Sequence, residues 1–240
     1  MTHPKNHRDK IPAANRTWMK HVDYVEVHTH TKMNESNIPY RTLYAGLKED
    51  RSELWCKVKR SFQYAYLNVS KKFDWYIKID DDTYVIADNL NKFLKTLDPN
   101  KPVFAGGRLA PFVKNGYVSG GIVILSRKTL ELLVYNVFPH ITTSCKQGEL
   151  DDLELGKQLE KLEIYPIPTR DSDDKALFHI FTADETYHGY NDTRIDFGTY
   201  YKDKLRPGFE EFSKESIAFH HLTVNELYLF EILTYIVRKH

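Results

Sequence analysis

Apolar and polar residues follow one another along this chain in a helical rhythm over several long stretches. Between positions 54 and 69 apolar side chains recur every three or four residues, and positions 87–97 show the same spacing. This periodicity gathers the apolar residues on one face and predicts amphipathic helices. The helices predicted in this way cover 11–20, 51–69, 87–97, 126–135, a segment that opens at Glu149, and 225–240.

Shorter stretches rich in aromatic and β-branched residues predict strands between these helices. The predicted strands are 23–28, 73–79, 103–105, 122–125, 217–222 and, as an edge strand because of its prolines, 163–168. Residues 29–40 and 140–148 are predicted as loops, and residues 171–207 as long loops or a lid. Strands alternate with helices over 240 residues without a repeat or a linker, which predicts one α/β domain with helices on both faces of its sheet.

Composition excludes some functions and leaves the compartment open. A net charge of +1 argues against a general nucleic-acid binder. The sequence contains no run of about 18 apolar residues, so no membrane span is predicted in it. The two cysteines form neither a disulfide framework nor a zinc motif. Cys56 is predicted to be a small buried hydrophobe in a helix, and Cys145 lies in a polar loop. The two could pair only if the fold brought them together.

Three consecutive carboxylates stand where the predicted strand 73–79 ends. Asp80, Asp81 and Asp82 repel one another and suit neither a strand nor a helix interior, so they call for a compensating positive charge. A divalent cation that holds a diphosphate would supply it, because hard cations take carboxylate and phosphate oxygens. The alternative is a solvated acidic turn at the start of the next helix, where carboxylates complement the helix dipole.

Three further features carry both a structural and a functional interpretation. Asp151 and Asp152 open a helix, where they could cap it or provide a general base. His220 and His221 could be structural, or one imidazole could complete a mixed oxygen and nitrogen site suited to Mn²⁺. The pair Gly120 and Gly121, before an apolar strand, could be a tolerant strand entry or a place where a ligand approaches the backbone.

The order of these features resembles the inverting β1,3-glycosyltransferases of the GT-A fold, a mixed Rossmann-like sheet flanked by helices. The nearest resemblance is to the core 1 β1,3-galactosyltransferase group, whose relatives include the Fringe proteins. It covers the chain from about position 15 to the C-terminus. The motifs that carry it are DWYIKIDDDTYV at 74–85, DNL at 88–90, PFVKNGYVSGG at 111–121, DDLELG at 151–156, and Phe219-His220.

The resemblance assigns roles to particular positions of this sequence. It implies that Asp80, Asp82 and His220 bind Mn²⁺, with Asp82 as a direct ligand, and that Asp152 is the base that deprotonates the acceptor hydroxyl. Donor contacts are implied for Thr2, Thr17, Asp80, Asp81, Gly120 and Gly121, and acceptor contacts for Tyr117 and Asp151.

The activity implied is transfer of galactose from UDP-galactose, in β1,3 linkage, to N-acetylgalactosamine on a glycoprotein. Alternatives are a related β1,3-glycosyltransferase with another donor or acceptor, and a non-catalytic paralogue or chaperone of the transferase. The resemblance also implies the lumenal side of the Golgi membrane, and it allows a homodimer. No nucleic acid partner is expected.

The chain departs from the family pattern at its start and on the acceptor side. Met1-Thr2-His3-Pro4 resembles the tail of an apolar first strand, so the domain 1–240 is expected to be N-terminally incomplete, with that strand truncated. The Trp-rich acceptor stretch of the family is replaced by residues 194–201, and the adjacent cysteine pair before the late histidine by residues 210–213. These departures make the identity of the acceptor the least constrained part of the prediction.

Overall fold

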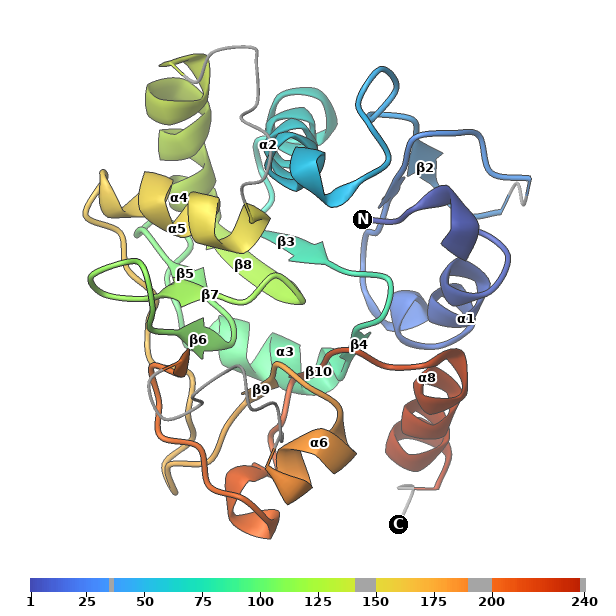
Figure 1. Ribbon diagram of the computed structural model, residues 1–240, viewed down its shortest axis with the longest axis vertical. Helices are drawn as coiled ribbons and strands as arrows, with labels where there is room; N and C mark the ends of the chain where they lie inside the picture. The colour runs from blue at the N-terminus through green and yellow to red at the C-terminus, as the bar shows by residue number, and fades with distance from the viewer. Residues whose placement is uncertain (35–36, 141–149, 190–199, 238–240) are drawn as a thin grey trace.

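The protein is a mixed α/β domain whose central sheet has the strand order β3-β8-β5 (Figure 1). The computed structural model describes residues 1–34, 37–140, 150–189 and 200–237. Strand β8 (Ile122–Ser126) runs antiparallel to both β3 (Trp75–Ile79) and β5 (Phe104–Ala105). Within the described residues there are also the sheets β4-β10-β9, β1-β2 and β6-β7. This architecture confirms the predicted mixed α/β fold with helices around the sheet.

The remaining elements have the following bounds. The α-helices are α1 (Lys10–Arg16), α2 (Leu54–Tyr64), α3 (Ala87–Lys95), α4 (Arg127–Leu132), α5 (Asp151–Glu160), α6 (Ala183–His188) and α8 (Val224–Glu231). The other strands are β1 (Val27–His28), β2 (Tyr40–Arg41), β4 (Tyr84–Val85), β6 (Arg108–Leu109), β7 (Tyr117–Val118), β9 (Phe178–His179) and β10 (Ala218–Phe219). Short 3₁₀ or π segments are η1 (Pro4–Asn6), η2 (Trp18–His21), η3 (Arg51–Glu53), η4 (Ala65–Val69), η5 (Leu133–Val137), η6 (Phe138–His140), η7 (Phe209–Glu211) and η8 (Ile232–Ile236).

The central sheet is buried on both faces, which explains its nearly continuous apolar strands. Side chains alternate across a strand, so Ile122 and Ile124 of β8 pack into one core cluster while Val123 and Leu125 pack into the other. The first cluster includes residues of α1 and α3, and the second includes residues of α2, α4 and α5. Figure 1 shows α2 and α3 on opposite sides of β3 and β8. The sheet therefore holds its strand ends in a fixed frame.

The long helices follow the predicted periodicity closely. The predicted helix 51–69 is present as η3, α2 and η4 in succession, and 87–97 is present as α3. Ser126 caps α4 as predicted, because its side chain accepts a hydrogen bond from the Thr129 amide at 3.1 Å. The prediction for 11–20 divides into α1 and η2, since Thr17 adopts a non-helical conformation between them. The C-terminal helix is confirmed as α8 and η8, and residues 238–240 lie outside the described residues.

Four sequence predictions differ from the structure. The strand predicted at 23–28 is limited to β1, which pairs in parallel with β2, so the loop predicted at 29–40 ends in a strand. Residues 163–168 form no strand, although the Ile167 amide donates to the Phe104 carbonyl at 3.0 Å. The loop predicted at 171–207 contains β9 and α6, which begins with a capping box between Thr182 and Glu185. Residues 190–199 within it lie outside the described residues.

The structure describes one of the two cysteines, Cys56. Cys56 is 4% exposed in α2, which confirms the predicted burial in a helix, and it is disulfide-bonded, a point that the sequence left open. Cys145 lies outside the described residues. The sequence could not decide this point, because pairing depends on the distance that the fold sets between two thiols.

Gly156 in α5 gives a first test of the packing. A Cβ at this position would lie 2.5 Å from the Tyr117 Cβ, where α5 crosses β7. We expect Gly156→Ala to lower the free energy of unfolding by about 2 kcal/mol, because overpacking outweighs the gain in helix propensity. Chemical denaturation would measure this change, with Lys157→Ala on the same helix as the control that changes stability by less than about 0.5 kcal/mol. Equal stability of wild type and Gly156→Ala would contradict the packing described.

Candidate active site

The three consecutive aspartates lie at the carboxyl end of β3, and their carboxylates contact overlapping sets of neighbours. The Asp80 amide donates to the Gly121 carbonyl at 3.0 Å, which extends the β3-β8 pairing by one residue. Asp81 accepts hydrogen bonds from Thr2 Oγ1 at 2.6 Å and from Asn6 Nδ2 at 2.8 Å. Asp82 contacts His220, which follows β10, and shares Lys10 with Asp81. The turn thus distributes three carboxylates around the strand end instead of leaving them side by side in solvent.

Asp82 forms the closest contact with the late histidine. Its Oδ1 lies 3.1 Å from His220 Nε2, and its Oδ2 lies 3.1 Å from Lys10 Nζ. Burial alone would raise the pKa of Asp82, but the hydrogen bonds and charges of His220 and Lys10 outweigh it and hold that pKa below its ordinary value. The Leu222 amide donates to the Asp82 carbonyl at 2.9 Å, which fixes the histidine loop against the aspartate turn.

Gly121 is the reason that the His220 ring can reach this position. A Cβ on Gly121 would lie 2.5 Å from both Cγ and Nδ1 of His220. His220 Nδ1 is buried without a hydrogen-bond partner, so the ring turns its Nε2 toward Asp82 and, at 3.9 Å, toward Asp80 Oδ2. The glycine pair predicted as a close-approach site is therefore used by a histidine side chain of the same chain.

Lys78 links the aspartate turn to the helix that carries the predicted base. Its side chain is only 3% exposed, and its Nζ lies 2.8 Å from Asp80 Oδ1 and 3.3 Å from Asp151 Oδ2. It also donates to the Gly120 carbonyl. Burial disfavours its charge, but Asp80 and Asp151 outweigh that effect and hold the pKa of Lys78 above its ordinary value. One buried cation therefore connects three of the segments that the sequence singled out.

Asp152 is the predicted base, and its surroundings suit that role. It lies in the first turn of α5, accepts a hydrogen bond from the Leu153 amide at 2.7 Å, and also accepts one from the Gly120 backbone. Burial, followed by the negative charge of Asp151, raises the pKa of Asp152 to about 6. A carboxylate with a pKa close to neutral can accept a proton more effectively than one with an ordinary value.

The structure brings together most of the residues that the sequence assigned to the site. Thr2, Asp80, Asp81, Asp82, Gly120, Gly121, Asp151, Asp152 and His220 are joined by the contacts given above. Thr17 has no contact with them, since it is fully buried and its hydroxyl donates to the Ala13 carbonyl at 2.8 Å at the end of α1. Tyr117 is 1% exposed beneath Gly156, so its ring belongs to the core below the site and forms no exposed wall. The donor and acceptor roles of all these residues stay predictions.

Lys78, Lys10 and Asn6 are the contributors to the cluster that sequence reasoning missed. Lys78 had a usable signal, because a lone charge in the buried run WYIKI requires a partner. Lys10 and Asn6 had none, since they lie more than 70 positions before the aspartates and only the fold brings them close.

The donor atoms at this site are compatible with a divalent cation. Asp80, Asp82 and His220 offer two carboxylates and one imidazole nitrogen, which are ligand types that Mn²⁺ accepts, and the imidazole Nε2 lies 3.1 Å from Asp82 and 3.9 Å from Asp80. No group of three or more His, Cys, Asp or Glu side chains is arranged to hold a metal within the described part of the chain. The carboxylates are instead neutralised by Lys10, Lys78 and the imidazole. Binding a cation would therefore require these carboxylates to exchange one set of positive partners for another.

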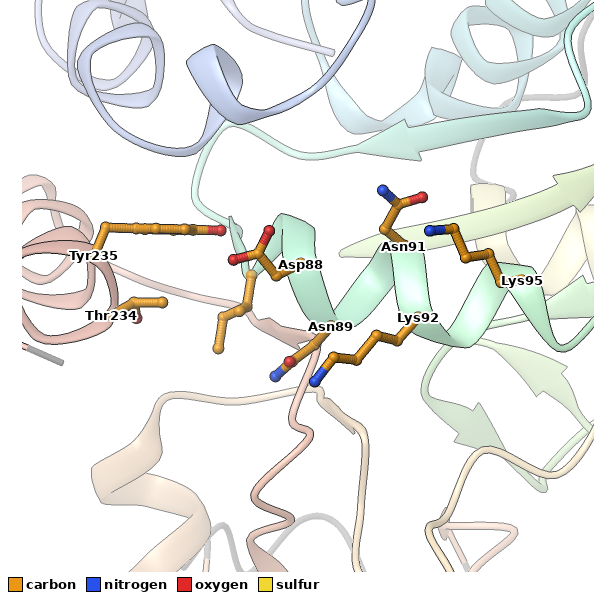
Figure 2. A pocket seen from close by; sticks show the side chains of 8 residues that line it. Asp88, Asn89, Asn91, Lys92, Lys95, Thr234 and Tyr235 are labelled. Atoms are coloured by element: carbon orange, nitrogen blue, oxygen red, sulfur yellow. The ribbon is translucent and has the colours of Figure 1, made fainter. Parts of the chain in front are cut away.

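A hollow of about 610 Å³ lies between α3 and η8, away from the aspartate turn (Figure 2). It is lined by Asp88, Lys92 and Lys95 of α3 and by Tyr235 of η8, among others. Its lining contains none of the residues in the aspartate cluster. The chemistry suggested by the sequence thus belongs to the end of β3.

The mixed α/β fold and the arrangement at the end of β3 are those of a GT-A-type glycosyltransferase domain. A model of Fringe-like proteins matches residues 1–180, and the chain belongs to this Fringe-like family of β1,3-glycosyltransferases. This finding confirms the resemblance drawn from the aspartate, glycine and histidine motifs.

Several characterised proteins are similar to the chain. Glycoprotein-N-acetylgalactosamine 3-beta-galactosyltransferase 1 of Xenopus laevis is 28% identical over 244 residues, which cover 100% of this chain and 66% of that protein. Chondroitin sulfate synthase 3 of Homo sapiens is 26% identical over 65% of this chain and 19% of its own length. Beta-1,3-glucosyltransferase of Mus musculus is 29% identical over 63% of this chain and 30% of its own length. The chain thus spans about two thirds or less of each relative.

Among the described residues, none of the helices combines the length and the apolar character that crossing a bilayer requires.

Proposed function

We propose that this chain is an inverting transferase that moves galactose from UDP-galactose to the 3-hydroxyl of N-acetylgalactosamine linked to a glycoprotein. The observation that carries the proposal is the position of Asp152 beside Gly120, next to the cluster of Asp80, Asp82 and His220. The similarity to the Xenopus galactosyltransferase along the whole chain supports the choice of donor and acceptor.

In the proposed reaction, different residues bind the metal, accept the proton and position the base. Asp80, Asp82 and His220 would hold Mn²⁺, which when bound supplies positive charge to the departing diphosphate. Asp152 takes the proton from the acceptor hydroxyl as that oxygen attacks the anomeric carbon. Lys78 holds the Gly120 carbonyl and Asp151 in place and so orients the start of α5. A single displacement of this kind inverts the anomeric centre without a covalent sugar intermediate.

A second candidate is a related β1,3-transferase that uses another donor or acceptor. The mouse beta-1,3-glucosyltransferase matches at 29% identity, similar to the galactosyltransferase, although over less of the chain. A panel of UDP-sugars and acceptor glycosides separates the two candidates. A non-catalytic paralogue is disfavoured, because Asp80, Asp82, Asp152 and His220 are all present and adjacent.

The compartment proposed is the Golgi lumen. Disulfides persist in oxidising compartments, and the bonded state of Cys56 supports a secretory location. The Golgi itself and a homodimeric state are proposed from the family resemblance.

The test is calorimetric titration of UDP into the purified chain, with and without Mn²⁺. We expect binding that depends on Mn²⁺ in the wild type and that is lost in Asp82→Ala, because this change removes the carboxylate closest to His220. Lys128→Ala is the matched control, since the side chain of this half-buried residue forms an ion pair with Glu131 of the same helix, and neither residue belongs to the aspartate cluster. Binding of UDP that is unaffected by both Mn²⁺ and Asp82→Ala would contradict the proposal.

A further inference from the structure

Asn68 begins the sequence Asn68-Val69-Ser70, which has the acceptor pattern for an N-linked glycan, Asn-X-Ser/Thr with X other than Pro. The same pattern begins at Asn15, Asn34 and Asn191. The patterns at 34 and 191 include residues outside the described ones, so the structure allows a comparison of Asn15 and Asn68. A glycan is bulky and hydrophilic, and an asparagine that carries one must lie on the surface of the folded domain.

The pattern at Asn15 is part of the packing of α1. Asn15 is half-buried, and Thr17 is fully buried, with its hydroxyl donating to the Ala13 carbonyl at 2.8 Å. Helix α1 packs against α8, and Ala14 and Trp18 on either side of the pattern belong to the core. A glycan at this position would disturb the packing of the helix.

The pattern at Asn68 lies at the surface, where the chain leaves a helix. Segment η4 buries Tyr66, whereas Leu67 and Asn68 next to it are exposed. The segment ends at Ser70, which is half-buried and has an extended backbone with φ −160° and ψ 136°. The exposed asparagine can therefore carry a large polar group without displacing the core residues of η4.

No role in the fold accounts for an asparagine at position 68. Asparagine is a weaker helix former than alanine or leucine, and it is favoured at helix ends, where it caps the helix or adopts a positive φ. Asn68 does neither, because the C-cap of η4 is Ser70 and the φ angle of Asn68 is not positive. Among the residues that the structure describes, its side chain has no hydrogen-bond partner. Its carboxamide is therefore free to react.

We propose that Asn68 carries an N-linked glycan when the chain passes through the secretory lumen. Its Nδ2 forms a bond with the anomeric carbon of the first sugar of a lipid-linked oligosaccharide, and the oligosaccharyltransferase of that compartment catalyses the step. The bond from this carbon to the lipid diphosphate breaks, the diphosphate leaves with the electron pair of that bond, and the amide nitrogen loses one proton. The inference rests on the secretory compartment proposed above and not on the sugar transfer by this chain.

The glycan would lie at the opposite end of β3 from the aspartate turn. The hydroxyl of Tyr76 in β3 donates to the Ser70 carbonyl, which holds the end of η4 near the start of this strand. Asp80 follows the last residue of β3, and a strand of this length is roughly 17 Å long. A glycan on Asn68 thus leaves the candidate active site open, and UDP binding should not depend on it.

The test is expression of the full chain, fused to a cleavable secretion signal, in cultured mammalian cells. Peptides of the cell-associated and the secreted chain are mapped by mass spectrometry, with and without peptide N-glycosidase F. We expect Asn68 to be occupied in most molecules and Asn15 in few. Asn68→Gln and Ser70→Ala should each remove this glycan, whereas Ser70→Thr should retain it, because it keeps the hydroxyl that the acceptor pattern requires.

Asn15→Gln is the matched control, and it should leave the glycan on Asn68 in place. The proposal is overturned if Asn68 of the wild type is unoccupied in both fractions, or if Ser70→Ala keeps the glycan on Asn68. Calorimetry with UDP and Mn²⁺ on the wild type and Asn68→Gln separates this proposal from the proposed function. Occupied Asn68 without UDP binding would refute the transferase alone, and UDP binding by a chain without the glycan would refute the glycosylation of Asn68 alone.

Discussion

Replacing Asp152 with Asn should lower the rate of sugar transfer by about 10³-fold while Mn²⁺-dependent UDP binding stays within about twofold of the wild type. The amide keeps the size of the side chain but cannot accept a proton from the acceptor hydroxyl. In the proposed reaction UDP is held by a different part of the site, at the end of β3. Single-turnover transfer assays and calorimetry on the same preparation measure the two quantities. Full turnover by Asp152→Asn would show that another group is the base.

The pH dependence of transfer is a second test of Asp152 as the base. Burial and the charge of Asp151 raise the pKa of Asp152 to about 6, and only the deprotonated carboxylate can act as a base. Transfer by the wild type should therefore rise with pH through about 6 and then level off. Asp151→Asn removes a negative charge that raises this pKa, so the rise should move to lower pH. A profile in Asp151→Asn that moves to higher pH would contradict the charge coupling described.

Replacing Gly121 with Ala should weaken Mn²⁺-dependent UDP binding by about 10- to 100-fold. The new Cβ would lie 2.5 Å from Cγ and Nδ1 of His220, so the ring would have to leave its position beside Asp82. Gly121 makes no direct ion pair itself, and the loss would come from displacement of the histidine. Calorimetric titration of UDP in the presence of Mn²⁺ measures the effect.

A double-mutant cycle shows whether the loss passes through His220. If it does, Gly121→Ala combined with His220→Ala should bind UDP no more weakly than His220→Ala alone. Gly120→Ala is the neighbouring comparison, because its Cβ would meet Lys78 Nζ at 3.4 Å and the Asp151 carboxylate at 3.7 Å, both ordinary contacts with side-chain atoms. It should cost less than Gly121→Ala. Additive losses in the cycle would place the effect of Gly121 elsewhere in the fold.

The sequence predicted the elements whose formation depends on local sequence patterns. The apolar periodicity of 51–69 and 87–97 requires only one packed face, and both helices are present. The adjacency of Asp82 and His220, 138 positions apart, could be predicted only through the resemblance to a family, since spacing alone carries no such information.

The failures have a common physical origin in pairing between distant segments. β2 and β9 are two residues long, and each exists only because a neighbouring strand edge is available. Lys10 reaches Asp82 from a helix near the start of the chain, and no local pattern marks it. Lys78 could have been found, because an unpaired lysine is costly in a strand that is otherwise buried.

The cations that surround the aspartate turn have a consequence for how the protein reaches its native state. Lys10, Lys78 and His220 already offset the mutual repulsion of the carboxylates within the chain itself. We therefore expect folding not to depend on a bound ion, in contrast to small domains that are unfolded until a metal binds. An ion that enters such a site competes with internal partners, so its affinity is reduced by their displacement. If the proposed site binds Mn²⁺, we expect the domain to stay folded when the ion leaves.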